Sequence, residues 1–92
     1  MLKQTTIKIT QKDIDSGVPV NCYDCPIALS LRRKYKAARS IEVGGSRADI
    51  HYKNHVKYIM LPKSLVNFIS RFDENLPVKP ITVIVKYKTE VI

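Results

Sequence analysis

The chain has 92 residues and contains no long hydrophobic run, and its first residues, Met-Leu-Lys-Gln-Thr-Thr, include no apolar stretch. A membrane-spanning helix needs about 20 consecutive apolar residues, so the sequence excludes one and we expect no membrane partner. A secretory signal needs an apolar core near the N-terminus, so we expect a cytoplasmic protein. The chain has only two cysteines. In a reducing cytosol, a structural disulfide between them is not expected.

Acidic residues are scarce. The chain carries 8 Asp+Glu against 16 Lys+Arg, for a net charge of +8, and no acidic residue lies between Asp24 and Glu42. Within that interval, five basic residues occupy eight positions, namely Arg32, Arg33, Lys34, Lys36 and Arg39. A small domain with this charge attracts polyanions at long range.

Length and composition predict one globular domain over residues 1–92. Hydrophobic residues make up 45% of the chain and charged residues 26%, which is ordinary for a folded protein. A chain of this size can bury one core. We find no internal repeat and no linker.

The first half of the chain predicts a strand and two helices. Residues 5–10 alternate as a strand does, and a short helix follows over residues 11–15. Thr10 is expected to cap this helix with Asp13 as in a capping box, and Gly17 to end it in a left-handed conformation. The main helix is expected to begin at Asp24 or Cys25, with Pro26 in its first turn.

This main helix is predicted to be the longest of the chain and to extend to Arg39. Its apolar stripe at helical spacing includes Leu31, Tyr35 and Ala38. On another stripe, Arg32, Lys36 and Arg39 recur at i, i+4 and i+7. The basic cluster should therefore form one face of a helix.

The second half predicts strands around a further helix. A short strand over residues 40–43 precedes a hairpin with a three-residue turn, Lys53-Asn54-His55, in which Tyr52 pairs with Val56. Pro62 opens a helix that Asn75 and Pro77 end. The last strand is expected over residues 80–87, with Ile84 suggesting burial on both faces.

Together these elements predict an α+β fold. We expect a small, mainly antiparallel sheet of about five strands with two main helices packed on one face.

Four residues carry side chains that bind zinc in other proteins, namely Cys22, Cys25, His51 and His55. A zinc finger expects about 12 residues between the two pairs, whereas 25 intervene here. The predicted hairpin also places His51 opposite Lys57, and a cation beside a metal ion is unfavourable. We favour the interpretation that the histidines lie on the surface, with their hydrogen bonds made, and that a cysteine is buried in the core. No metal and no cofactor are therefore expected.

The sequence offers little support for catalysis. The Cys22-x-x-Cys25 pair before a helix is compatible with a redox site, but Asp24 between the cysteines opposes thiolate formation. No hydrolase motif is present. Gly44, Gly45 and Ser46 could form a small anion-binding nest with Arg47 above it, although an ordinary turn is the commoner outcome. We therefore expect a protein that is not an enzyme.

The leading functional hypothesis is phosphate binding. Arginine favours bidentate contact with phosphate, and three of the five clustered cations are Arg. Tyrosines such as Tyr23 and Tyr52 could stack on bases. The candidate residues for binding a nucleic acid or a nucleotide are Arg32, Arg33, Lys34, Lys36, Arg39 and Arg47. The alternative is that the charge only keeps the protein soluble.

One resemblance covers most of the chain. Ile7-Lys8-Ile9-Thr10-Gln11-Lys12-Asp13-Ile14, then Gly17, then Cys25-Pro26-Ile27-Ala28-Leu29-Ser30-Leu31-Arg32, resembles a group of short phage and prophage proteins. Leu61-Pro62, Phe68-Ile69, Phe72-Asp73, Pro77-Val78 and Pro80 fit the same layout. No activity is established for the group, so no residue role can be transferred.

The resemblance implies a small, phage-encoded accessory protein in the host cytosol. Such proteins often inhibit or redirect host machinery, for example as anti-defence proteins. The second functional hypothesis is therefore an inhibitor that docks on a host protein, through an acidic surface of that protein or through an exposed sheet edge or apolar patch of its own. The sequence leaves the oligomeric state open, a homo-oligomer included.

Overall fold

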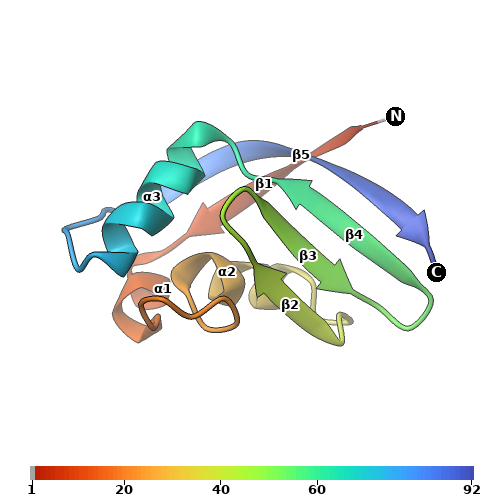
Figure 1. The fold of residues 1–92 in the computed structure, drawn as a ribbon, viewed down its shortest axis with the longest axis horizontal. Coiled ribbons are helices and arrows are strands. Elements are labelled where there is room, and N and C mark those ends of the chain that lie inside the picture. The colour runs from red at the N-terminus through yellow and green to blue at the C-terminus, as the bar shows by residue number, and fades with distance from the viewer. Residues whose placement is uncertain (1) are drawn as a thin grey trace.

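The computed structural model describes residues 2–92 and confirms the α+β class (Figure 1). The element order is β1 (Lys3–Ile9), α1 (Gln11–Ser16), α2 (Pro26–Lys34), β2 (Ser40–Val43), β3 (Arg47–His51), β4 (His55–Met60), α3 (Lys63–Asp73) and β5 (Ile81–Val91). The five strands form one sheet in the order β1-β5-β4-β3-β2, and every neighbouring pair is antiparallel.

Helix α2 contacts both β1 and β2, which are the two outer strands of the sheet. The sheet therefore curves around α2. Figure 1 shows the helices gathered at one end of the molecule, while the opposite ends of β3, β4 and β5 extend beyond them. The face of the sheet that carries the core is thus covered by helices over only part of its length.

The core lies between this face and the helices. Ile27 and Leu31 from α2, Ile50 and Ile59 from the sheet, and Leu65 from α3 have no exposed surface. Each side chain of this size contributes about 1.5–3 kcal/mol when it is removed from water.

The starts of the first two helices agree with the sequence prediction. The Thr10 Oγ1 accepts a hydrogen bond from the Asp13 N–H at 3.2 Å, and the Thr10 N–H donates to Asp13 Oδ2 at 2.9 Å, which completes the capping box. Cys25 is the N-cap of α2, where its Sγ accepts from the Ala28 N–H at 3.4 Å, and Pro26 follows as the first helical residue.

Gly17 does not adopt the predicted left-handed conformation; its φ and ψ are −70° and 154°. Glycine is needed here for space. A Cβ on Gly17 would lie 2.8 Å from both Cδ and Cγ of Pro26 and 2.9 Å from the Asp13 carbonyl oxygen. These atoms belong to a buried ring and to backbone, so they cannot turn aside.

We expect Gly17→Ala to lower the free energy of unfolding by about 1–3 kcal/mol because of this overlap. Gly45→Ala is the matched control, since a Cβ there meets no atom within 4 Å. Urea unfolding of both variants checks the expectation. Equal stability of the two would show that Gly17 is not constrained by Pro26.

The prediction that the main helix reaches Arg39 is wrong, because α2 ends at Lys34. The Tyr35 N–H still bonds to the Leu31 carbonyl, but the backbone of Tyr35 then leaves the helix, with φ −114° and ψ 72°. By Arg39 the chain already pairs with β3, since the Arg39 N–H donates to the His51 carbonyl at 2.7 Å. The longest described helix is α3.

Helix α3 begins and ends as predicted. Pro62 is its N-cap, and Asn75 just after its end has a positive φ of 61°. Asparagine tolerates this left-handed conformation better than most residues. Leu65, Phe68 and Phe72 are buried on one side of the helix.

The β3–β4 hairpin has a register that differs by one residue from the prediction. His51 pairs with Val56, and the Tyr52 N–H bonds to the His55 carbonyl at 2.9 Å, so the turn consists of Lys53 and Asn54. A shift of one residue moves every side chain of a strand to the opposite face. The reason for this choice is Ile59, which pairs with Ala48 and is fully buried.

As a consequence Lys57, pairing with Ile50, lies on the core face, and the predicted position of His51 opposite Lys57 is wrong. Val56, Tyr58 and Met60 take the other face, which no described helix covers. Lys57 is the unexpected member of the core face, since it is the only charged residue of β4.

The outer strands also differ in length from the prediction. β1 begins at Lys3, and β5 continues to Val91. Ile81, Val83, Val85 and Tyr87 alternate along β5 on the core face of the sheet, because Val85 is buried and the other three pack against the core.

The prediction that both faces of the last strand are buried is wrong, since 67% of Ile84 is exposed.

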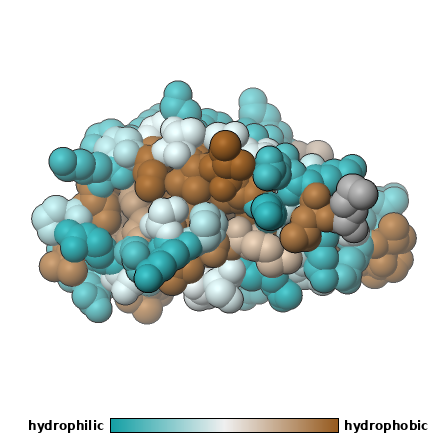
Figure 2. Space-filling model, turned by 90° about the horizontal axis from the view of Figure 1, so that it is seen from above, coloured by the Kyte–Doolittle hydropathy of each residue, from teal (hydrophilic) through white to brown (hydrophobic). Residues whose placement is uncertain are grey.

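Figure 2 shows that exposed hydrophobic residues form separate groups between hydrophilic ones on the side viewed. Among residues 2–92, no helix has the length and apolar character that crossing a membrane requires.

Candidate anion-binding site

The two arginines of α2 are held by carboxylates. Arg32 donates from Nη2 to Asp24 Oδ1 at 2.8 Å and to the Tyr23 carbonyl at 2.7 Å. Arg33 donates from Nη1 and Nη2 to the two carboxylate oxygens of Asp13, at 2.7 and 3.0 Å. Arg32 and Arg33 are therefore both paired within the chain. The predicted helical row of Arg32, Lys36 and Arg39 does not form, because α2 ends at Lys34.

Asp13 is buried beneath Arg33. Burial alone would raise the pKa of the Asp13 carboxyl group. The hydrogen bonds from Arg33 and from the Thr10 N–H, together with the charge of Arg33, outweigh it and hold this pKa below its ordinary value. Arg33 is thus part of the structural support of α1 and β1.

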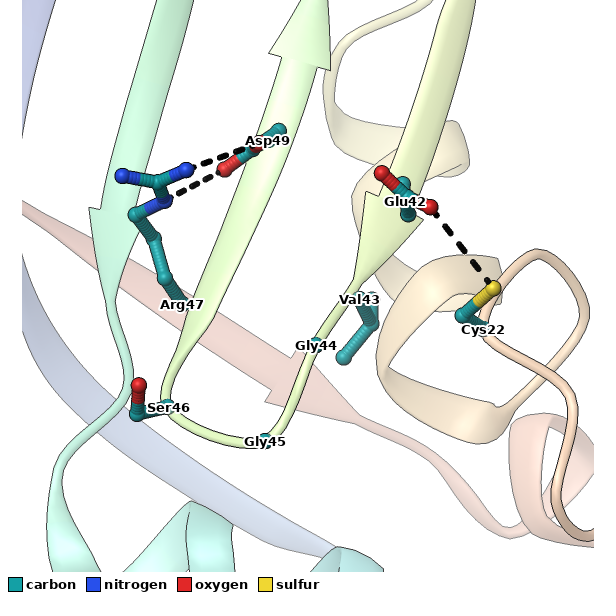
Figure 3. A pocket seen from close by; sticks show the side chains of 8 residues that line it. All are labelled: Cys22, Glu42, Val43, Gly44, Gly45, Ser46, Arg47 and Asp49. Carbon is teal, nitrogen blue, oxygen red and sulfur yellow. Dashed lines mark hydrogen bonds and ion pairs between the residues drawn. The ribbon is translucent and has the colours of Figure 1, made fainter.

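Arg47 is also paired, and the Gly44–Gly45 segment forms a turn and not an anion-binding nest, in agreement with the interpretation that the sequence favoured. The Arg47 Nε donates to Asp49 Oδ1 at 2.7 Å, and in Figure 3 the side chain points toward Asp49 and away from the Gly44–Gly45 turn. The Gly44 N–H bonds to the Arg47 carbonyl at 2.8 Å. No glycine of the described chain has a positive φ, whereas a nest alternates right- and left-handed residues.

The hollow beside this turn has a volume of about 560 Å³ and is open to solvent. Figure 3 shows Cys22 and Glu42 on one side of it and the Arg47–Asp49 pair on the other. The Cys22 Sγ lies 4.0 Å from Glu42 Oε2. Acidic groups on both sides make the hollow unsuited to an anion.

The four zinc-type residues do not come together. Cys25 is buried as a helix cap, and burial raises the pKa of its thiol. Cys22 lies beside Glu42, while the His55 ring stacks on Tyr52 at a centroid distance of 4.3 Å beside the β3–β4 turn. Residues 2–92 contain no group of three or more His, Cys, Asp or Glu side chains arranged to hold a metal ion.

A different group of basic residues forms around Lys57. Its Nζ lies 4.3 Å from the ring centre of Tyr35, 4.8 Å from that of Tyr87 and 5.9 Å from that of Tyr52. An ammonium group at these distances is attracted by the electron-rich ring faces. Tyr35 follows α2, Tyr52 precedes the hairpin turn and Tyr87 belongs to β5, so three separate segments position this lysine.

Two further lysines lie near Lys57. The Nζ of Lys34 is 5.8 Å from the ring centre of Tyr35, and Lys3 pairs with Tyr87 across the β1–β5 ladder. Burial lowers the pKa of Lys57, and the charges of Lys34 and Lys3 lower it further. We call this group the lysine–tyrosine site, defined as Lys3, Lys34, Lys57, Tyr35, Tyr52 and Tyr87.

No carboxylate within residues 2–92 forms an ion pair with any of these three lysines. The site therefore concentrates positive charge that the rest of the protein does not offset. Lys34 is also in the last turn of α2, where the helix dipole favours a cation. An anion placed between the three ammonium groups would relieve their mutual repulsion.

The segment that follows α2 adds two exposed cations. Lys36 lies in the turn after Tyr35, and Arg39 immediately precedes β2. Neither has an ion-pair partner within the described chain. Of the predicted phosphate-binding residues, Lys34, Lys36 and Arg39 therefore remain available, whereas Arg32, Arg33 and Arg47 are engaged.

Sequence reasoning missed Lys3 and Lys57. Lys3 was placed outside the first strand, and Lys57 was placed on the wrong face by the three-residue turn. Two-residue turns are the commonest in hairpins, and a turn of Lys53 and Asn54 groups Lys57 with Ile50 on one face. The two-residue turn, together with Tyr35 on the apolar stripe of the main helix, is the signal in the sequence that could have found Lys57.

Comparison of this chain with protein-family models, with curated proteins and with solved structures gives no match.

Proposed function

We propose that this protein is a non-enzymatic binding protein that holds a phosphate-rich ligand, a nucleic acid or a nucleotide, at the lysine–tyrosine site. The observation that supports it is the convergence of Lys3, Lys34 and Lys57 without a carboxylate, whereas Arg32 and Arg33 of α2 are each paired with one. Three ammonium groups gathered at one place without a carboxylate partner are what an anion site requires.

The chemistry of the site suits phosphate. Lysine ammonium groups act as point charges toward phosphate oxygens, and the tyrosine rings hold Lys57 in place without neutralising it. Lys36 and Arg39 can contact neighbouring phosphates, so a ligand with several phosphate groups would engage up to five cations. The Lys57 ammonium group lies over the ring faces of Tyr35 and Tyr87. Because these faces are occupied by Lys57, we assign the site to phosphate binding and not to base stacking.

Binding to a fluorescein-labelled, mixed-sequence DNA duplex should weaken steeply with salt. If all five cations contact phosphates, the logarithm of the association constant falls with the logarithm of salt concentration with a slope of about −4 to −5. Fluorescence anisotropy from low to physiological salt measures this slope. Absence of binding at low salt, or a slope near zero, would contradict nucleic-acid binding.

The same assay separates the two phosphate sources. A nucleoside triphosphate that displaces the duplex at concentrations near its own dissociation constant, measured by calorimetry, would identify a nucleotide as the tighter ligand. A nucleotide without effect, combined with a steep salt slope, would identify nucleic acid. If neither the duplex nor the nucleotide binds, the proposed function is overturned.

A second candidate is the inhibitor that docks on another protein, within a phage-type accessory role. The observation that favours it is that β1 forms one margin of the sheet and pairs on one side only. Such an edge presents backbone groups to which a strand of another chain can bond.

A further inference from the structure

The outer edge of β1 presents unpaired backbone groups. β1 is the first strand in the sheet order and pairs only with β5. The Lys8 carbonyl accepts a hydrogen bond from Arg33 Nη2 at 2.9 Å, so this carbonyl points away from β5. Backbone groups alternate in direction along a strand, and therefore those of Gln4 and Thr6 point outward as well.

Arg33 shows what this edge can bind. Its guanidinium lies where the N–H of an additional strand would lie, and it is held there by Asp13. The contact closes the edge at Lys8 and leaves the outward groups of Gln4 and Thr6 without a bond from α1 or α2 in the described chain. The open part is thus long enough for a segment of about four residues.

A groove runs beside this edge, between β1 and α2. It has a volume of about 230 Å³, and its walls include Thr6, Lys8, Thr10, Ser30, Arg33 and Lys34. The walls combine strand and helix, so a segment lying in the groove would contact both. α2 contacts β1 along the same side of the sheet, as the fold in Figure 1 illustrates.

The charge around the groove selects the partner. Lys3 and Lys8 lie on β1, and Lys34 lies on the facing wall. None of the three has a carboxylate partner within residues 2–92. A second copy of this chain would bring its own Lys3 and Lys8 to the edge, and like charges on paired strands are unfavourable. Acidic side chains are favoured at the same positions.

We propose that β1 accepts an extended acidic segment of a partner protein as an additional strand, seated between Gln4–Thr6 and α2. Main-chain hydrogen bonds to Gln4 and Thr6 would hold the segment, and Lys3, Lys8 and Lys34 would favour its carboxylates. The inference stands apart from the lysine–tyrosine site because it rests on backbone groups of β1, although it shares Lys3 and Lys34 with that site.

Hydrogen exchange on the unaltered protein tests it. The probe is an acetylated peptide of alternating Glu and Val, seven residues long, added to ¹⁵N-labelled protein. The amide protons of Gln4 and Thr6 should exchange at least about tenfold more slowly with the peptide bound. Inorganic pyrophosphate is the matched anion, and it should leave these two amides unchanged.

Two further peptides, N-methylated at the Val residues or at the Glu residues, keep the charge and remove alternate donors. We expect at least one of them to bind about tenfold more weakly than the parent peptide. Equal affinity of all three peptides, equal protection by pyrophosphate, or no binding of the parent peptide would each overturn the inference. None of these outcomes bears on DNA binding, so the two proposals fail separately.

Discussion

Asp13→Ala should lower the free energy of unfolding by about 3 kcal/mol, a large effect for a single substitution. The carboxylate is buried, accepts two hydrogen bonds from Arg33 and one from the Thr10 N–H, and closes the capping box of α1. Half of the Arg33 side chain is exposed, so Arg33 regains water and limits the loss.

Urea unfolding measures this loss. Asp15→Ala is the matched control, because it removes from the same helix an exposed carboxylate that accepts a hydrogen bond from the Gln11 side chain. This substitution should change the free energy of unfolding by about 0.5 kcal/mol or less. A loss no larger for Asp13→Ala than for Asp15→Ala would show that the contacts of Asp13 do not stabilise the fold.

The contribution of Asp13 also depends on pH. Its pKa in the folded protein lies below the value of 3.8 expected without the fold. A carboxyl group of this kind contributes stability that is fully present above the unfolded pKa and is lost as pH falls through the folded pKa. The difference in stability between the parent protein and Asp13→Asn should therefore shrink below about pH 4. A difference that stays constant with pH would contradict the lowered pKa.

The local parts of this fold could be predicted from the sequence. Thr10 with Asp13, Pro26 after Cys25, and Asn75 after a helical stripe are short-range signals, and each marks a helix end because the side chains act within one turn. The α+β class followed from these ends together with the alternation in Ile7–Ile9 and Ile81–Tyr87.

The long-range parts could not be predicted in this way. Arg33 meets Asp13 only because α2 folds back across α1, so a segment free of acidic residues in the sequence is not free of them in space. The face occupied by Lys57 depended on one residue of register in a short turn. Both errors concern the candidate site, where charges from distant segments decide which cations are available.

The central claim is that the lysine–tyrosine site, and not net charge alone, binds phosphate. Lys3→Gln, Lys34→Gln and Lys57→Gln combined in one variant should weaken binding to labelled duplex DNA about 100-fold at low salt and reduce the salt slope by about 3, because three phosphate contacts are lost. Circular dichroism and thermal unfolding of this variant verify that it is folded, since Lys57 also contacts three tyrosines.

The matched control combines Lys12→Gln, Lys63→Gln and Lys79→Gln. These exposed lysines lie on α1, at the start of α3 and before β5, and their loss changes the net charge by the same amount. The measurement is the anisotropy titration of both triple variants side by side. The account predicts a loss of about 100-fold for the site variant and less than about tenfold for the control. Equal losses in the two variants would show that the charge acts without a site and would contradict the claim.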